Sequence, residues 1–186
     1  MLSITQARSI QVFHPGGNIA FDVFNPRRED IKIDSIAHAL SNICRFNGNC
    51  KEFYSVAQHS VMVSKICLPN DALQGLLHDA SEAYLGDVVQ PLKRFSGMFD
   101  RYHELEHQLQ EMIYSKFEVV PHVNSSCHHA DMLALAYEKR DLMSPAVEDI
   151  WTDLPAVGST GYSIIPLSPN EAKVDFLERW WELTEG

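Results

Sequence analysis

Residues 55–85 read SVAQHSVMVSKICLPNDALQGLLHDASEAYL, and the spacing of their apolar side chains predicts two consecutive helices. Ser55 can cap the first helix, which should end near Pro69 because proline rarely continues a helix. Asp71 can cap the second helix, which should run without interruption to Gly86, a residue suited to a helix C-terminus. The stretch therefore indicates a helical domain.

His59 should point into the protein. At about 100° per residue, it shares a helix face with the apolar residues Val56, Met62, Val63 and Ile66. A single inward histidine is more often a core residue that hydrogen-bonds a backbone carbonyl than a metal ligand. Its position alone therefore leaves both interpretations open.

The second predicted helix has two chemically different faces. An apolar stripe is formed by Leu73, Leu76, Leu77, Ala80 and Tyr84. His78, Asp79 and Glu82 fall together on the opposite side, which would ordinarily be a solvated face. His78 and Asp79 are splayed by about 100°, so both could instead reach one ion, with Glu82 over the open side. The pair is thus either part of a polar surface or a pair of metal ligands.

Asp131 lies in a predicted helix at about residues 124–143, on the side that also carries Leu135, Glu138 and Leu142. This geometry predicts a buried carboxylate. Burying a carboxylate without a partner costs several kcal/mol, so Asp131 needs a cation, a hydrogen-bond donor or a proton. A metal ion and a neighbouring arginine would satisfy it equally well.

The remaining segments extend the helical pattern in both directions. A short β-hairpin is predicted at about residues 8–24, and further helices from Asp34 or Ser35 towards Gly48, at about 97–117 and at 170–183. We expect one domain over residues 1–186, with a helical core at about 34–145 and a C-terminal loop and helix at about 146–186. The expected fold class is all-α with an N-terminal hairpin.

The composition fits one globular domain with an acidic surface. The 186 residues are 45% hydrophobic, and 25 acidic against 15 basic side chains give a formal charge of -10. This charge repels a polyanion, so duplex nucleic acid is not an expected partner, whereas a small anion can bind in a cleft beside a cation. No run approaches about 18 apolar residues, and the start lacks a signal-peptide pattern. We expect a cytoplasmic protein that does not enter a membrane, with free thiols at Cys44, Cys50, Cys67 and Cys127.

His59, His78, Asp79 and Asp131 together would form a mixed nitrogen and oxygen donor set. Such a set suits a divalent metal ion, and four protein ligands on an octahedral ion leave positions for water and phosphate. The sequence does not choose among Co, Mn, Mg, Zn, Ni and Fe. It contains no HExxH string, no glycine-rich phosphate loop and no GxSxG motif. The combination indicates metal-assisted hydrolysis at a site of another design.

The order of these residues resembles that of the HD-domain metal-dependent phosphohydrolases. His59 is followed about nineteen residues later by the pair His78 and Asp79, and about fifty residues further on by Asp131. The resemblance covers about residues 30–145 and implies a compact HD-type bundle of helices. It also implies that these four residues are the metal ligands.

Two longer strings narrow the resemblance. HDASEAYLGDVVQPLKRF (residues 78–95) is similar to the corresponding region of bacterial 5'-deoxyribonucleotidases and related phage and prophage nucleotide phosphohydrolases. IAHALSNICRFNGNCKEFYSVAQHS (residues 36–60) is most similar to a prophage-encoded subgroup. The hairpin and the spacer CRFNGNCKEFYSVAQHS differ from the best-known 5'-nucleotidases in length and residues. The resemblance therefore leaves the base and sugar of the substrate open.

The resemblance also implies roles for four further residues. Glu82 would handle protons beside the metal, and Asp87 would orient the attacking water. Arg45 and Lys93 would hold the phosphate. Each has an ordinary alternative: an exposed Glu82, an Asp87 that caps the segment after Gly86, and surface charges at Arg45 and Lys93.

The implied activity is metal-dependent hydrolysis of the phosphate ester of (deoxy)nucleotides by a 5'-nucleotidase-like enzyme. Related phage enzymes remove all three phosphates from deoxyadenosine triphosphate. A triphosphohydrolase with two or more metals is therefore the first alternative, in which Glu82, Asp87 or Glu138 would be a further ligand. A catalytically silent nucleotide-binding module is the second alternative.

The last predicted helix has apolar residues on two sides. Val174, Leu177 and Trp181 form one stripe, and Phe176 and Trp180 lie beside it. A surface helix needs only one apolar side to pack on its own domain. The second side suggests a homodimer.

Overall fold

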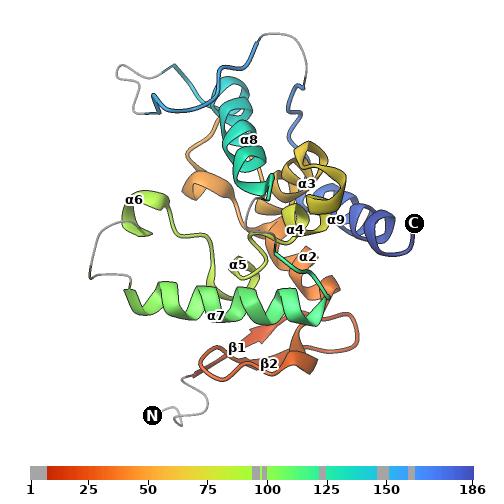
Figure 1. The fold of residues 1–186 in the computed structure, drawn as a ribbon. Helices are drawn as coiled ribbons and strands as arrows, with labels where there is room; N and C mark the ends of the chain where they lie inside the picture. The colour runs from red at the N-terminus through yellow and green to blue at the C-terminus, as the bar shows by residue number, and fades with distance from the viewer. Residues whose placement is uncertain (1–7, 94–96, 98–99, 122–124, 146–150, 159–161) are drawn as a thin grey trace.

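The computed structural model of the chain describes residues 8–93, 97, 100–121, 125–145, 151–158 and 162–186. Most of these residues are helical, and among them the strands form one short antiparallel hairpin (Figure 1). This arrangement agrees with the expected helical class and N-terminal hairpin. Within the described part of the chain, none of the helices is long and apolar enough to cross a membrane. The four cysteines are free, as expected.

The strands of the hairpin come early in the chain, and most of the helical residues follow them. The strands are β1 (Ser9–Val12) and β2 (Ile19–Asp22). The α-helices are α2 (Ile33–Asn42), α3 (Val56–Ile66), α4 (Ala72–Leu76), α5 (Glu82–Leu85), α6 (Gln90–Lys93), α7 (Asp100–Lys116), α8 (Cys127–Leu142) and α9 (Pro169–Thr184). Short 3-10 turns are η1 (Arg28–Asp30), η2 (Arg45–Gly48) and η3 (Pro69–Asp71).

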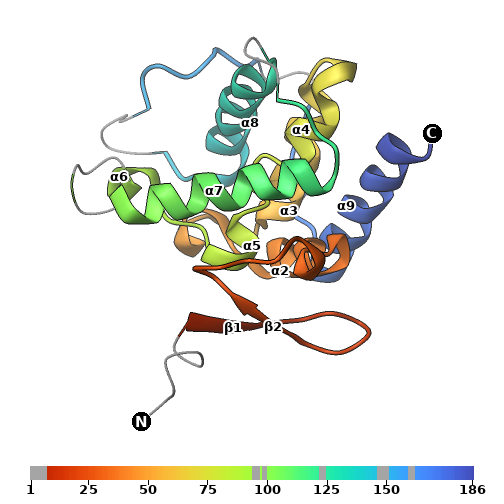
Figure 2. The same cartoon turned by 60° about the horizontal axis from the view of Figure 1, so that its bottom comes forward.

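The hairpin lies at one end of the molecule, next to α2 and α7 (Figure 2). Its register pairs Ser9 with Asp22 and Val12 with Ile19. Phe21 of β2 is fully buried and stacks on Tyr84 of α5, with ring centroids 4.2 Å apart. The hairpin is therefore attached to the helical body by aromatic packing.

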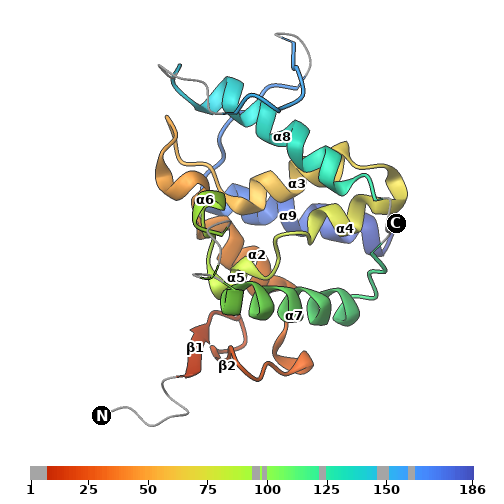
Figure 3. The ribbon, with the colours of Figure 1, turned by 60° about the vertical axis from the view of Figure 1, so that its left-hand side comes forward.

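Helix α3 runs through the middle of the helical body and packs against α2, α4, α8 and α9, with α8 crossing it on one side (Figure 3). The predicted cap is confirmed, because the Ser55 side chain accepts a hydrogen bond from the Gln58 backbone N–H at 3.2 Å. His59 is 0% exposed, so its predicted inward orientation is also confirmed. The centre of the fold thus holds a histidine.

Two apolar clusters meet along α3. Its residues Val56 and Val61 join a cluster with the hairpin, α2, α4, α7 and α9, whereas Met62 and Val63 join a second cluster with α8. Two-sided burial of one helix leaves little room for a polar side chain unless that side chain has partners. The surroundings of His59 therefore need to supply hydrogen-bond partners.

Helix α9 closes the first cluster with Phe176 and Trp180, which are both buried. Ser168 and Glu171 form a capping box at its N-terminus. Val174 and Trp181 are 53% and 49% exposed. Part of the predicted apolar stripe is thus on the surface, and the homodimer remains a prediction.

The second predicted helix is not continuous, which corrects the sequence-based expectation. Helix α4 ends at Leu76, residues 77–81 form turns, and α5 begins at Glu82. The Gln110 side chain of α7 donates to the Leu77 carbonyl at 2.7 Å and accepts from the Ser81 N–H at 3.0 Å. A long-range partner thus satisfies backbone groups at the break, so a break here costs little.

Asp71 does not cap α4, contrary to the prediction. Its carboxylate instead accepts from the backbone N–H and the hydroxyl of Ser126, at 2.8 and 2.7 Å. Because Ser126 directly precedes α8, this contact fixes the start of α8 against the start of α4. A tertiary contact has replaced the local cap.

Helix α2 also differs from the prediction. It begins at Ile33, so Asp34 and Ser35 lie inside its first turn, and it ends at Asn42, well before Gly48. The chain leaves the helix because Cys44 forms an antiparallel bridge with Ser55. This bridge places the following loop beside the N-terminus of α3.

Candidate metal centre

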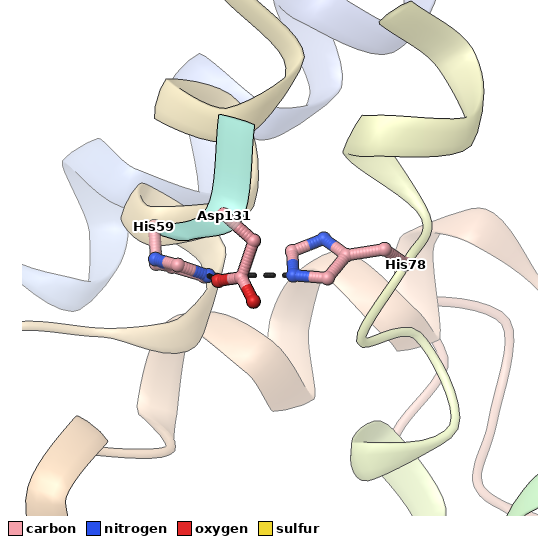
Figure 4. A group of neighbouring side chains, drawn as sticks. All are labelled: His59, His78 and Asp131. Carbon is pink, nitrogen blue, oxygen red and sulfur yellow. Dashed lines mark hydrogen bonds and ion pairs between the residues drawn. The ribbon is translucent and has the colours of Figure 1, made fainter. Parts of the chain in front are cut away.

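Three predicted ligands converge from three segments (Figure 4). His59 comes from α3, His78 from the turn after α4, and Asp131 from α8. One potential ligand atom from each lies within 4.8 Å of the other two. The His59 Nε2 atom is 3.3 Å from His78 Nε2 and 3.2 Å from Asp131 Oδ1. Nitrogen and oxygen donors at this spacing fit a single divalent metal ion.

The break between α4 and α5 orients His78. Its Nδ1 atom hydrogen-bonds the Gly75 carbonyl at 2.8 Å, which directs Nε2 towards His59. On the continuous helix expected from the sequence, His78 would have lain on a polar surface face. The turn therefore directs the His78 side chain into the cluster and not towards the surface.

Asp79, the fourth predicted ligand, lies beside the three-residue group. Its Oδ2 atom is 3.1 Å from His78 Nε2 and 3.8 Å from His59 Nε2. Burial would raise the pKa of Asp79, but the charges of His78, His59 and Arg45 hold that pKa well below its ordinary value. Asp79 is thus ionised and faces both imidazoles.

Asp131 is less buried than predicted, because 39% of its side chain is exposed. Burial raises its pKa, yet the hydrogen bond and charge of His59 lower it to about 2. The charge of the Asp131 carboxylate is therefore stabilised by the cluster and by solvent, and not by a single buried partner. Asp131 is also the most exposed side chain of the three, so the cluster meets solvent on its side.

The carboxylates of the cluster favour positive charge on His78. Burial alone would lower the pKa of His78, but Asp79 and Asp131 raise it to about 10. The two carboxylates thus stabilise a proton on the His78 imidazole. A divalent cation can replace that proton, since metal binding to histidine releases it. The donor types and this potential both fit a metal.

Arg45 faces the same cluster from η2. Its Nη2 atom is 3.0 Å from Glu138 Oε2, and Nη1 is 3.8 Å from Asp79 Oδ2. The next two residues, Phe46 and Asn47, have backbone φ angles of 56° and 51°. Residues other than glycine rarely adopt positive φ angles. Such strain is held by the surrounding structure and is common at functional sites. The two residues directly follow Arg45 in the same 3-10 turn.

Glu82 and Lys93 form a second, neighbouring polar group. Glu82 is only 5% exposed, so it is not the exposed surface residue that was the ordinary alternative. Lys93 Nζ is 3.3 Å from Glu82 Oε1 and 2.7 Å from Glu106 Oε1. Burial, followed by the charges of Asp79 and Asp87, raises the pKa of Glu82 to about 9. At neutral pH, Glu82 therefore carries a proton.

The predicted roles of Lys93 and Asp87 remain predictions. Lys93 contacts Glu82 and Glu106, as Arg45 contacts Glu138, and an ammonium with two such partners keeps a third donor. Burial raises the pKa of Asp87, and Arg45 and Asp79 are close enough to affect it. Asp87 thus borders the cluster without joining the three-residue group.

Sequence reasoning gave Glu138 a role only in the multi-metal alternative. The structure places this carboxylate, 0% exposed, with Oε1 2.6 Å from His59 Nδ1. The available signal was its position seven residues after Asp131, on the same side of α8. Gln110, which supports the break next to His78, offered no comparable signal.

Comparison with known proteins identifies relatives without a described activity. The chain is 38% identical over 173 residues to the uncharacterized protein YfdR of Escherichia coli K12, a match that covers 91% of this chain and 93% of YfdR. It is 35% identical over 105 residues to an uncharacterized protein of Rhodobacter capsulatus, covering 52% and 53% of the two chains. No family model matches the chain. The resemblance to HD-domain phosphohydrolases thus remains a prediction from motifs, whereas the first match shows that the chain belongs to the same family as YfdR.

Proposed function

We propose that the protein is an HD-domain metal-dependent phosphohydrolase that cleaves the phosphate ester of (deoxy)nucleotides. The convergence of His59, His78 and Asp131 within 4.8 Å carries this proposal. Three segments far apart in the chain supply these residues, so their meeting depends on the whole fold. Asp79 extends the donor set at 3.1 Å from His78 Nε2.

The donor chemistry fits a resident divalent metal that His59, His78, Asp79 and Asp131 would hold. Such an ion supplies Lewis acidity and activates water for hydrolysis. The partly exposed Asp131 leaves one side of the centre accessible to a substrate. A site closed on all sides by protein ligands would instead support a purely structural ion.

Arg45 is the residue best placed to bind a phosphate. Its side chain is 14% exposed, and its Nε atom has no hydrogen-bond partner among the described residues. A guanidinium can donate two parallel hydrogen bonds to the oxygens of one phosphate. Arg45 would thus orient the phosphate next to the cluster and offset its charge.

Glu82 would supply a proton to the leaving ribose oxygen. This oxygen is a poor leaving group, and a carboxylic acid that is protonated at neutral pH can donate to it. Lys93 pairs with Glu82 at 3.3 Å and would restrain it. Asp87, at the border of the site, would orient water. The acid and the cation that restrains it are already in contact.

A substrate panel tests the proposal. Protein loaded with Mn²⁺ or Co²⁺ is incubated with each deoxy- and ribonucleoside monophosphate and triphosphate, and products are separated by chromatography. We expect inorganic phosphate and a nucleoside from monophosphates. Tripolyphosphate from a triphosphate would instead establish the triphosphohydrolase alternative, and metal and nucleotide binding without any product would establish the silent module.

Glu82→Gln tests the assignment of the proton donor. The variant should bind metal with unchanged stoichiometry while kcat falls by about 10²-fold to 10⁴-fold, the usual contribution of general acid-base catalysis. Loss of one of two or more metals in Glu82→Gln would indicate that Glu82 is a ligand. Near-normal turnover would reject its role as proton donor.

A further inference from the structure

Glu138 joins the candidate metal ligand His59 to the candidate phosphate-binding Arg45. One carboxylate oxygen is 2.6 Å from His59 Nδ1, and the other is 3.0 Å from Arg45 Nη2. The Glu138 and His59 side chains are 0% exposed, and that of Arg45 is 14% exposed. The three side chains thus form one buried chain of hydrogen bonds that links α8, α3 and η2.

The two edges of the His59 ring face different partners. Nδ1 faces Glu138, whereas Nε2 faces Asp131 and His78 at 3.2 and 3.3 Å. A ligand of the same ion as Nε2 would have to lie on the Nε2 side. Glu138 is therefore placed to hold the ring and not to coordinate the ion that Nε2 faces.

A carboxylate at Nδ1 determines which ring nitrogen is free to bind a metal. Because an ionised carboxylate can only accept hydrogen bonds, the single proton of a neutral His59 ring must lie on Nδ1, which leaves the Nε2 lone pair directed at the cluster. Metal-binding histidines commonly have such a partner, and its removal typically weakens metal binding 10-fold to 100-fold. The first oxygen of Glu138 thus serves the metal side.

The second oxygen serves the anion side. Arg45 donates to Glu138 with Nη2 and lies 3.8 Å from Asp79 with Nη1, so these carboxylates restrain the guanidinium. A buried ion pair is a poor source of stability, because desolvation offsets most of the attraction between its charges. A core that contains Ala134 and Leu142 on the same helix could have been filled with apolar residues. A bridging role accounts for the retained charges.

We propose that Glu138 is a positioning residue that fixes His59 for metal binding and Arg45 for anion binding at once, so that one carboxylate couples the two halves of the site. This inference rests on the proposed metal centre. It adds that the affinity for metal and the affinity for phosphate share a single support. Loss of Glu138 should therefore weaken both affinities, although Glu138 contacts neither the ion nor the phosphate.

Glu138→Gln tests the coupling with almost no change in volume. The single amide oxygen of glutamine cannot accept from both partners, so the amide NH₂ must face one of them. If it faces Arg45, two donors oppose each other. If it faces His59 Nδ1, the ring proton must move to Nε2. We expect Co²⁺ affinity, measured by calorimetry on the purified full-length protein, to fall about 10-fold to 100-fold. At saturating Co²⁺, binding of inorganic phosphate should also weaken by about tenfold, the loss of one charge-assisted hydrogen bond.

Asp30→Asn is the matched control. Asp30 is also a buried carboxylate, and it accepts from Arg27 at 2.7 and 2.9 Å, but it lies in η1 away from the cluster. Its change to an amide should leave both affinities unchanged. An equal loss in Asp30→Asn would attribute the effect of Glu138→Gln to general loosening of the fold and overturn the inference.

The outcomes separate this inference from the proposed function. A wild-type protein that binds no metal rejects the metal centre and with it the inference, whereas tight wild-type binding with equal binding by Glu138→Gln rejects the inference alone. Should Glu138→Gln not fold, nitrogen NMR of ¹⁵N-histidine in the Zn²⁺-loaded wild-type protein still decides. We expect His59, assigned by its contacts to Glu138, to carry its proton on Nδ1, and a proton on Nε2 would overturn the proposal.

Discussion

Asp131→Asn should abolish most of the stabilisation that a bound metal gives the fold. Asp131 supplies its carboxylate from α8, and its Oδ1 lies 3.2 Å from His59 Nε2. Asparagine keeps the shape but removes the charge that attracts a cation. Because α8 meets α3 and α4 at this cluster, a metal held by all three segments should bind the folded chain and not the unfolded one.

The size of the effect follows from binding linkage. At a free metal concentration of about 100 times the wild-type Kd, binding stabilises the folded state by about 2.7 kcal/mol. For a chain of this length, each kcal/mol shifts Tm by roughly 2–4 °C, so the wild-type shift is about 5–11 °C. If losing the charged ligand weakens binding about 100-fold, the upper end for the loss of a supporting residue, about 0.4 kcal/mol remains. The shift then falls to about 1–2 °C.

Thermal unfolding measured for each protein with EDTA and with metal gives this shift directly. Any effect of Asp131→Asn on the metal-free fold cancels in the difference. Asp175→Asn is the matched control, since Asp175 is similarly exposed, at 34% against 39%, and is also paired with a cation, Lys65, at 3.4 Å. Equal shifts in wild type, Asp131→Asn and Asp175→Asn would refute the assignment of Asp131 as a ligand.

Three further outcomes are expected. Ser55→Ala, which removes the hydrogen bond to the Gln58 N–H, should cost about 1 kcal/mol in urea unfolding, and no loss would show that the cap is not needed. The unfolded chain releases the Glu82 proton near its ordinary pKa of 4.5 and the folded chain near about 9, so metal-free wild type should lose stability as pH rises between these values. Glu82→Gln should lose less over that range, and parallel pH profiles would contradict the raised pKa. Phosphate release should occur from nucleotides and not from oligonucleotides, because the chain carries a formal charge of -10, and comparable rates would contradict this selectivity.

The helices that were predicted well are those whose ends have local signals. Ser55 begins α3 through a hydrogen bond three residues away, so residues 55–58 contain the whole interaction. The inward position of His59 follows from helical periodicity, which is also local. Asp71 carries the same type of capping signal as Ser55, yet its carboxylate bonds Ser126, 55 residues away. The residues around Asp71 in the sequence could not indicate that its carboxylate would bond a distant residue and not cap the helix.

The candidate site also depends on a contact between residues distant in the sequence, which local patterns could not predict. Motif spacing named the residues that meet, but the continuous helix expected around His78 would have left its ring on a polar face. The observed orientation needs a break in that helix, and the break is supported by Gln110 of α7, whose amide serves Leu77 and Ser81. A helix interior breaks only when its freed backbone groups find other partners, and these partners came from a segment 29 or more residues away. Replacing Gln110 should therefore disturb His78 without touching it, which makes the α7 contact part of what assembles the candidate metal centre.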